Sequence, residues 1–245
     1  GAIKAERLYM TNEQEIVAQL MRGRLELGSL SNIATTVVIP EMALLSMPYL
    51  WKSDAERDFV IDNHALPVMN KLFEAKGMVI VGLSEVGWTN VFCKKACLLP
   101  ADVKGMKVRV SPSAASKVFW GSLGTTGVQL PFSELMPGLE NGLVEAGELP
   151  LSIYGSTPAT QSAPHYVMTR HALLGSTTVM TRELWPTLTP AQQKLVLDAR
   201  TPAASVRKAV AEDDKPRMEA FKAKGGFIHE LSAEQRAAWT RLVEP

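Results

Sequence analysis

The sequence lacks a long hydrophobic run, and this absence excludes one class of protein. A transmembrane helix needs about 20 predominantly apolar residues. The best apolar stretch among the 245 residues, positions 42–51, is short and is interrupted by Ser46 and Pro48. We therefore expect a chain that does not span a membrane.

An excess of either charge is also absent. The chain carries 26 basic and 25 acidic residues, which gives a formal net charge of +1. This balance provides no electrostatic case for binding nucleic acid or an anionic membrane surface. With 46% hydrophobic and 21% charged residues, the chain can offset its conformational entropy by burial. We expect it to fold as one large domain or two modest lobes.

Cysteine is scarce, because only Cys93 and Cys97 occur. A structural zinc site needs four ligands, and no histidine lies near this pair in the sequence. The spacing also differs from the Cys-x-x-Cys of a redox site. We expect no metal and no cofactor. Two interpretations of the pair stay open: reduced thiols in a cytosolic protein, or a disulfide-closed turn in an exported one.

The common catalytic motifs are missing as well. The sequence has no Gly-x-Ser-x-Gly elbow, no Gly-x-Gly-x-x-Gly, no phosphate-binding loop and no His-Glu-x-x-His. The four histidines are scattered, which favours surface or packed positions over a catalytic base: His64, His165, His171 and His229. The residues alone indicate no enzyme.

What the sequence does contain is an alternation of strand-length apolar runs with helical patterns. Residues 78–83 form a continuous apolar run typical of a buried strand, and a second strand is predicted at 108–110. A long polar helical region follows at 189–224, with kinks expected at Pro202 and Pro216. This alternation predicts an α/β fold.

One charged residue interrupts this pattern. Arg109 lies in the middle of the apolar strand at 108–110, and Ser111-Pro112 then begins a helix. A guanidinium that is buried without a partner is very costly, so an Arg109 that points into a cleft would need a carboxylate or another anion. The alternative is an arginine on the solvent side of an edge strand. The pattern does not decide between them.

The surrounding segment carries a family resemblance. Residues 99–110, Leu-Pro-Ala-Asp-Val-Lys-Gly-Met-Lys-Val-Arg-Val, resemble the "PxDlkGlKiRv" signature of DctP-type solute-binding proteins of tripartite ATP-independent periplasmic (TRAP) transporters. Five more matches lie in the same order along the chain: GRLELGSLS at 23–31, PYLW at 48–51, LPFSEL at 130–135, GLVEAGELP at 142–150 and LWPTLTPAQQ at 184–193. Each is weak alone, but together they are specific and cover nearly the whole chain.

The resemblance implies a two-lobed periplasmic binding-protein fold with hinge strands and a long helix that crosses both lobes. It places lobe I at 1–86 plus 175–214 and lobe II at 87–174 plus 215–245. It also implies an extracytoplasmic receptor that works as a monomer in the periplasm, binds a small carboxylate in the interlobe cleft and delivers it to the TRAP membrane subunits. A cytoplasmic ligand-sensing regulator domain with the same two-lobe plan is the alternative.

The family's site residues can be carried over by position. Arg109 resembles the arginine that pairs with the substrate carboxylate, and Phe132 resembles an aromatic residue that packs on the ligand. Ser29, Ser31 and Asn32 correspond to the first-lobe loop that lines the cleft. The remaining candidates are Trp88, Thr89, Glu148, Leu149, Tyr154 and Ser176.

Two departures from the family pattern bear on the ligand. A "GxR" motif reads Gly87-Trp88-Thr89, so Thr89 replaces a second arginine, and an "ENP" motif reads Glu148-Leu149-Pro150, so Leu149 replaces an asparagine. A second ligand carboxylate would then lack compensation for its lost hydration. Sugar hydroxyls would also lack partners. These departures favour an apolar or aromatic monocarboxylate.

The resemblance also bears on maturation. Gly1 corresponds to a point after the family's first strand and helix, so we expect about 30 residues of that unit to precede it. A signal peptide is expected to have been removed. Because an exported receptor matures in an oxidising compartment, we expect a disulfide between Cys93 and Cys97.

Overall fold

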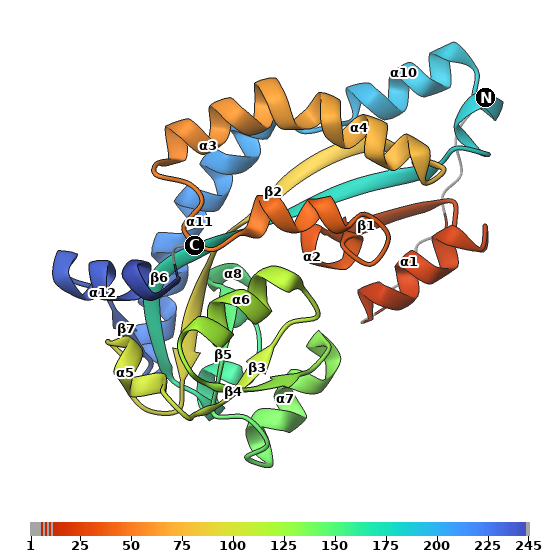
Figure 1. The fold of residues 1–245 in the computed structure, drawn as a ribbon. Helices are drawn as coiled ribbons and strands as arrows, with labels where there is room; N and C mark the ends of the chain where they lie inside the picture. The colour runs from red at the N-terminus through yellow and green to blue at the C-terminus, as the bar shows by residue number, and fades with distance from the viewer. Residues whose placement is uncertain (1–5, 7, 9, 11, 244–245) are drawn as a thin grey trace. The chain divides into compact units, whose positions relative to one another are not determined.

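The computed structural model describes residues 6, 8, 10 and 12–243, which form two compact units (Figure 1). Unit 1 comprises the chain up to Met42, Trp51–Glu85 and Gly175–Val206, and unit 2 comprises Ala43–Leu50, Val86–Leu174 and the chain from Arg207 onward. The boundaries predicted from the sequence lie at 86/87, 174/175 and 214/215, and they do not include the assignment of residues 43–50 to unit 2. The outer ends predicted for the lobes, Gly1 and Pro245, lie outside the described residues.

Unit 1 contains the first helices and the smaller group of strands. Its elements are α1 (Glu13–Met21), β1 (Leu27–Ser31), α2 (Asn32–Thr35), the start of η1 (Pro40–Ser46), which continues into unit 2, α3 (Asp54–Val60), η2 (Ile61–Ala65), α4 (Leu66–Ala75), η3 (Trp185–Thr187) and α10 (Pro190–Asp198). Local side chains fix several helix starts. The side chain of Asn12 accepts from the amides of Gln14 and Glu15, and Ser53 caps α3 in the same way.

Unit 2 contains most of the remaining helices and strands. They are α5 (Pro100–Val103), β3 (Lys107–Val110), α6 (Ala114–Ser122), β4 (Thr126–Gln129), α7 (Phe132–Glu140), β5 (Ala146–Pro150), α8 (Leu151–Tyr154), α9 (Ala159–Ser162), β7 (Phe227–His229) and α12 (Ala233–Val243). Three long elements belong partly to each unit: β2 (Met78–Cys93), β6 (His165–Thr181) and α11 (Ala203–Ala223).

The strands form one mixed sheet in the order β1-β6-β2-β5-β3-β4, with β7 paired to β6. Strand β3 is parallel to both of its neighbours, β4 and β5, whereas β1 and β6 are antiparallel. The strands predicted at 78–83 and 108–110 lie within β2 and β3. Pro202 separates α10 from α11, but α11 continues through the exposed Pro216, where water can satisfy the carbonyl that loses its helical partner. None of the helices in the described part of the chain has the length and apolar character needed to cross a bilayer.

The core of unit 2 forms two hydrophobic clusters, and alternate residues of β2 belong to different ones. Val91 and Cys93 lie in the first cluster and Phe92 lies in the second. Phe92 is paired with Gly147 of β5, and a Cβ atom at Gly147 would stand 2.5 Å from the ring. Only glycine therefore fits opposite this phenylalanine.

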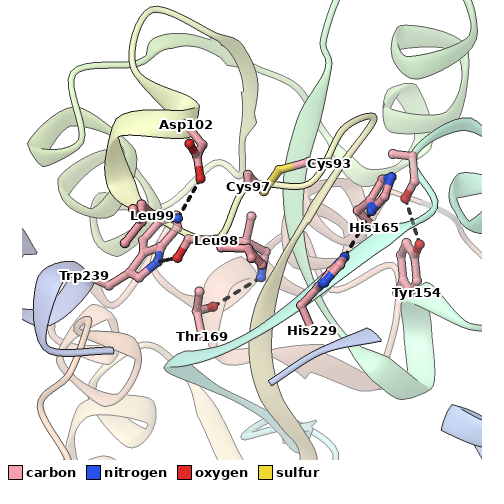
Figure 2. The surroundings of a disulfide bond; sticks show 12 residues. Cys93, Cys97, Leu98, Leu99, Asp102, Tyr154, His165, Thr169, His229 and Trp239 are labelled. Carbon is pink, nitrogen blue, oxygen red and sulfur yellow. Dashed lines mark hydrogen bonds between the residues drawn. A yellow bond between two sulfur atoms is a disulfide. The ribbon is translucent and has the colours of Figure 1, made fainter. Parts of the chain in front are cut away.

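A disulfide joins Cys93, the last residue of β2, to Cys97, which confirms the bond expected from an exported receptor (Figure 2). Both sulfur-bearing side chains are completely buried in the first cluster. The next residue, Leu98, accepts a hydrogen bond of 2.9 Å from Trp239 Nε1 on α12. The carbonyl next to the disulfide loop thus helps to hold α12 in place.

Replacing both cysteines with alanine is expected to lower the free energy of unfolding by about 2 kcal/mol, because a five-residue loop is then no longer constrained in the unfolded chain. Urea unfolding of the double variant would measure this loss, with Lys95→Ala in the exposed part of the loop as the control. Titration of the native protein with a thiol reagent, under denaturing and non-reducing conditions, should find no free thiol. Two free thiols would contradict the bond.

Candidate functional site

Arg109 is a buried cation on an interior strand. Its strand, β3, lies between β4 and β5, and only 5% of the residue is exposed. This burial excludes the alternative in which Arg109 lies on the solvent side of an edge strand. Arg109 Nε donates to the carbonyl oxygen of Leu130 at 3.0 Å, which fixes the plane of the guanidinium. In the described part of the chain, neither terminal amino group, Nη1 or Nη2, donates to an acceptor.

Glu148 on β5 is a second buried charge in the same region. Its Oε1 accepts from Ser111 Oγ at 3.3 Å and from Ser116 Oγ, and its Oε2 lies 2.8 Å from His171 Nε2. Burial raises the pKa of Glu148, but the hydrogen bond and charge of His171, the hydrogen bond from Ser116 and the charge of Arg109 outweigh it. The pKa therefore lies below its usual value, and Glu148 is a carboxylate at neutral pH.

Burial has the opposite effect on the arginine. It lowers the pKa of Arg109 to about 10, although the charge of Glu148 raises it. This value still lies well above neutral pH, so Arg109 remains a cation. Two opposite charges are thus kept in the interior of unit 2, and their combined charge is zero.

His171 is fixed on both sides of its ring. Its Nδ1 lies 2.9 Å from Thr169 Oγ1, which accepts the Val91 amide at 3.2 Å, and Phe119 stacks on the ring with centroids 3.7 Å apart. Because ionised Glu148 can only accept, Nε2 of His171 carries a hydrogen. The sequence predicts a surface or packed position for His171, and the packed position is confirmed. The sequence signal for its contacts is weak: Thr169 and His171 lie two residues apart in a strand that is mostly apolar.

Three other candidates from the sequence lie in unit 2, and they differ in how far they are exposed. Phe132 starts α7 with 42% of its surface exposed, two residues after the carbonyl that Arg109 holds. Trp88 is half-buried on β2, and the neighbouring Thr89 is buried and paired with Pro150 at the end of β5.

Leu149 and Tyr154, which the resemblance assigns to the ligand, have packing positions in unit 2. Both lie in the second hydrophobic cluster, Tyr154 stacks on Tyr166 with centroids 4.7 Å apart, and its hydroxyl donates to the carbonyl of Ala163 at 2.8 Å. The alternation of side chains along β5 sends Glu148 and Leu149 to opposite faces of the sheet.

The four remaining candidates belong to unit 1. Ser29 and Ser176 are brought together on the paired strands β1 and β6, with their hydroxyl oxygens 3.0 Å apart. Ser31 donates to Glu13 Oε2 at 2.6 Å and caps α2. Asn32 is buried and accepts the Gly175 amide at 3.2 Å. Ser31 and Asn32 therefore stabilise the local backbone of this unit.

The chain is similar to known proteins over most of its length. The family model of bacterial extracellular solute-binding proteins, family 7 (DctP), matches residues 9–245. The chain is 28% identical over 220 residues to the 2,3-diketo-L-gulonate-binding periplasmic protein YiaO of Escherichia coli (strain K12), covering 87% of this chain and 66% of that protein. It is 25% identical over 242 residues to the C4-dicarboxylate-binding periplasmic protein DctP of Rhodobacter capsulatus, covering 93% and 72%.

Solved structures give the same result. A TRAP periplasmic solute-binding protein from Sulfurospirillum deleyianum DSM 6946, with bound succinate, is 26% identical and superposes with a TM-score of 0.86 over 95% of this chain and 77% of that one. A second, from Sulfitobacter sp. NAS-14.1 with bound β-D-galacturonate, shares the fold at 24% identity, with a TM-score of 0.87 over 96% and 78%. These matches confirm the two-lobed periplasmic binding-protein fold.

Three observations agree. Arg109 is buried on the signature strand, the fold is α/β, and the family model matches residues 9–245. The chain belongs to the bacterial extracellular solute-binding proteins of family 7, the DctP-type receptors of TRAP transporters, and it is a binding protein rather than an enzyme.

Proposed function

We propose that this protein is a periplasmic receptor that binds a small organic acid through Arg109. The observation that carries the proposal is the guanidinium itself, which is buried and fixed by Leu130 while Nη1 and Nη2 have no acceptor in the described part of the chain. A carboxylate matches such a fork with two parallel hydrogen bonds. Because the plane of the fork is already fixed, little side-chain entropy is lost when the ligand binds.

The hydrogen bonds of Glu148 explain why Arg109 remains available to an external anion. The carboxylate of Glu148 is satisfied by Ser111, Ser116 and His171, and Arg109 makes no direct hydrogen bond to it. Glu148 thus offsets part of the cost of burying the arginine through its charge alone. The donors of Arg109 are left to the ligand, and Phe132 is exposed for contact with the ligand's body.

The compartment and the partner form the second part of the proposal. A disulfide is typical of proteins that mature in an oxidising compartment, and Cys93 and Cys97 form one here. This supports a periplasmic receptor over a cytoplasmic regulator of the same plan. We infer that it acts as a monomer and passes its ligand to TRAP membrane subunits, as its family implies. Recovery of the native protein from the cytoplasm after cell fractionation would refute the location.

For the ligand, we propose a monocarboxylate with an apolar or aromatic body. The support is Thr89 in the place of a family arginine, together with the half-buried Trp88 and the exposed Phe132. Leu149 and Tyr154 lie in the core and do not contribute to this preference. A ligand with a second carboxylate would lose hydration at that group without gaining a paired cation.

Titration calorimetry should rank isovalerate and phenylacetate above succinate and sialic acid. We expect the preference over succinate to be at least about tenfold, because one uncompensated charged hydrogen bond is worth roughly 1.5 to 3 kcal/mol. Isovalerate and succinate are similar in size, so this pair isolates the effect of the second charge. Tighter binding of succinate or sialic acid would overturn the proposed ligand class and leave the role of Arg109 intact.

A further inference from the structure

Two histidines that are far apart in the sequence meet where β7 pairs with β6. The parallel register places His165 opposite Phe227 and Val167 opposite His229. Paired residues and residues two apart share a face of the sheet, so His165, Phe227 and His229 lie on one face. Nδ1 of His165 is 3.0 Å from Nε2 of His229 (Figure 2).

The surroundings leave the pair accessible and neutral. Both histidines are half-buried, and Phe227, which is 51% exposed, stacks on His165 with ring centroids 4.6 Å apart. Burial lowers the pKa of both rings, and the neighbouring His165 lowers that of His229 further. Neutral imidazoles offer the lone pairs that a metal ion requires.

The two rings share a hydrogen bond in the free protein, and this arrangement sets what an ion would require. The nitrogens are 3.0 Å apart and the ring centroids 5.3 Å apart, so the two nitrogens face each other along one line. Both rings must turn before their lone pairs converge on one ion. Among divalent ions that accept imidazole, Cu²⁺ binds most tightly and Ni²⁺ ranks high in the order of affinities.

We propose that His165 and His229 form a binding site for a borderline divalent ion of the Cu²⁺ or Ni²⁺ class. Among the described residues, no group of three or more histidine, cysteine or carboxylate side chains could hold an ion, so the pair supplies two nitrogen ligands and water supplies the rest. In the free protein one ring donates its N–H to the other. On binding, that proton moves through solvent to the other nitrogen of the same ring, both facing nitrogens bind the ion, and no proton is lost.

Such an ion would link β7 to β6. Strand β7 has only three residues, and its His229 would share the ion with His165 of β6. An ion that binds only the folded chain raises its stability by mass action. This site does not involve Arg109, so it is independent of the proposed carboxylate binding.

The test is titration of the tag-free protein with CuCl₂ and NiCl₂, followed by calorimetry and, for copper, by electron paramagnetic resonance. We expect one saturable ion per chain and hyperfine splitting from two nitrogens. His165→Gln and His229→Gln should each weaken binding at least tenfold, since changes that merely disturb ligand orientation already cost about 10- to 100-fold. His64→Gln, at an exposed histidine on another element, is the matched control and should bind as the native protein does.

Three outcomes would overturn the site: no saturable binding by the native protein, a copper spectrum without two nitrogens, or unchanged affinity in both variants. Circular dichroism and carboxylate binding of each variant report whether it remains folded. If a variant does not fold, the nitrogen count of the native protein decides alone. Magnesium chloride should not bind, because two imidazoles offer no oxygen ligands to a hard ion.

Discussion

Replacing Arg109 with alanine is expected to weaken binding of the ligand carboxylate at least about a hundredfold. The fork formed by Nη1 and Nη2 makes two charge-assisted hydrogen bonds, and each contributes roughly 1.5 to 3 kcal/mol. Since each 1.4 kcal/mol changes affinity about tenfold, the loss of both exceeds two decades. Titration calorimetry with the tightest-binding monocarboxylate measures the effect directly.

Arg109→Lys separates the shape of the group from its charge. A lysine retains the positive charge next to Glu148, but it cannot donate two parallel bonds or keep the bond to the Leu130 carbonyl. Its affinity should therefore also be poor, while its thermal unfolding stays closer to that of the native protein than the alanine variant does. An Arg109→Ala protein that is folded and binds with native affinity would end this assignment.

Glu148→Leu is expected to lower the free energy of unfolding by about 3–5 kcal/mol, the typical cost of removing one partner of a buried ion pair. The loss leaves the Arg109 cation with a single carbonyl acceptor, and it takes the acceptor away from Ser111, Ser116 and His171. Glu148→Gln keeps the size and one acceptor oxygen, so it should lose less. Glu145→Gln, an exposed position three residues earlier on the chain, is the matched control.

The same carboxylate predicts a pH dependence. The pKa of Glu148 in the folded protein lies below its ordinary value of 4.5, so the folded state favours the charged form. Its stabilising contribution is complete above that ordinary value and is lost as the pH falls through the folded value. The difference in unfolding free energy between native protein and Glu148→Gln should therefore be largest at neutral pH and shrink below pH 4.5. A difference that stays constant from neutral pH down to about pH 3 would contradict a charged Glu148.

The predictions from sequence succeeded where the signal is local. The alternation of runs predicted the α/β class, and the strand at 108–110 with its arginine lies in β3 as expected. Glu148 was also among the candidates. The polar contacts were not predictable in this way, because His171 lies 23 positions after Glu148 in the sequence, and His229 lies 64 positions after His165. Neither pair shares a motif, so only the pairing of strands brings them together.

The orientation of other candidates could not be predicted from the motifs that contain them. Leu149 and Glu148 point to opposite faces of the sheet, and Leu149 and Tyr154 pack in the second hydrophobic cluster. The side chains of Ser31 and Asn32 satisfy nearby groups of Glu13, Ala34 and Gly175. The ligand contacts of these four residues stay predictions.

The bond between Trp239 and Leu98 also has a consequence for the order of events during synthesis. The Cys93–Cys97 loop needs only a few neighbouring residues to close, but the cluster that covers it includes Trp239 and Val243 of α12. Before α12 has been synthesised, Trp239 cannot stack on Phe119, and this face of Phe119 is open to water. The core of unit 2 can therefore close fully only after residues 233–243 have been synthesised.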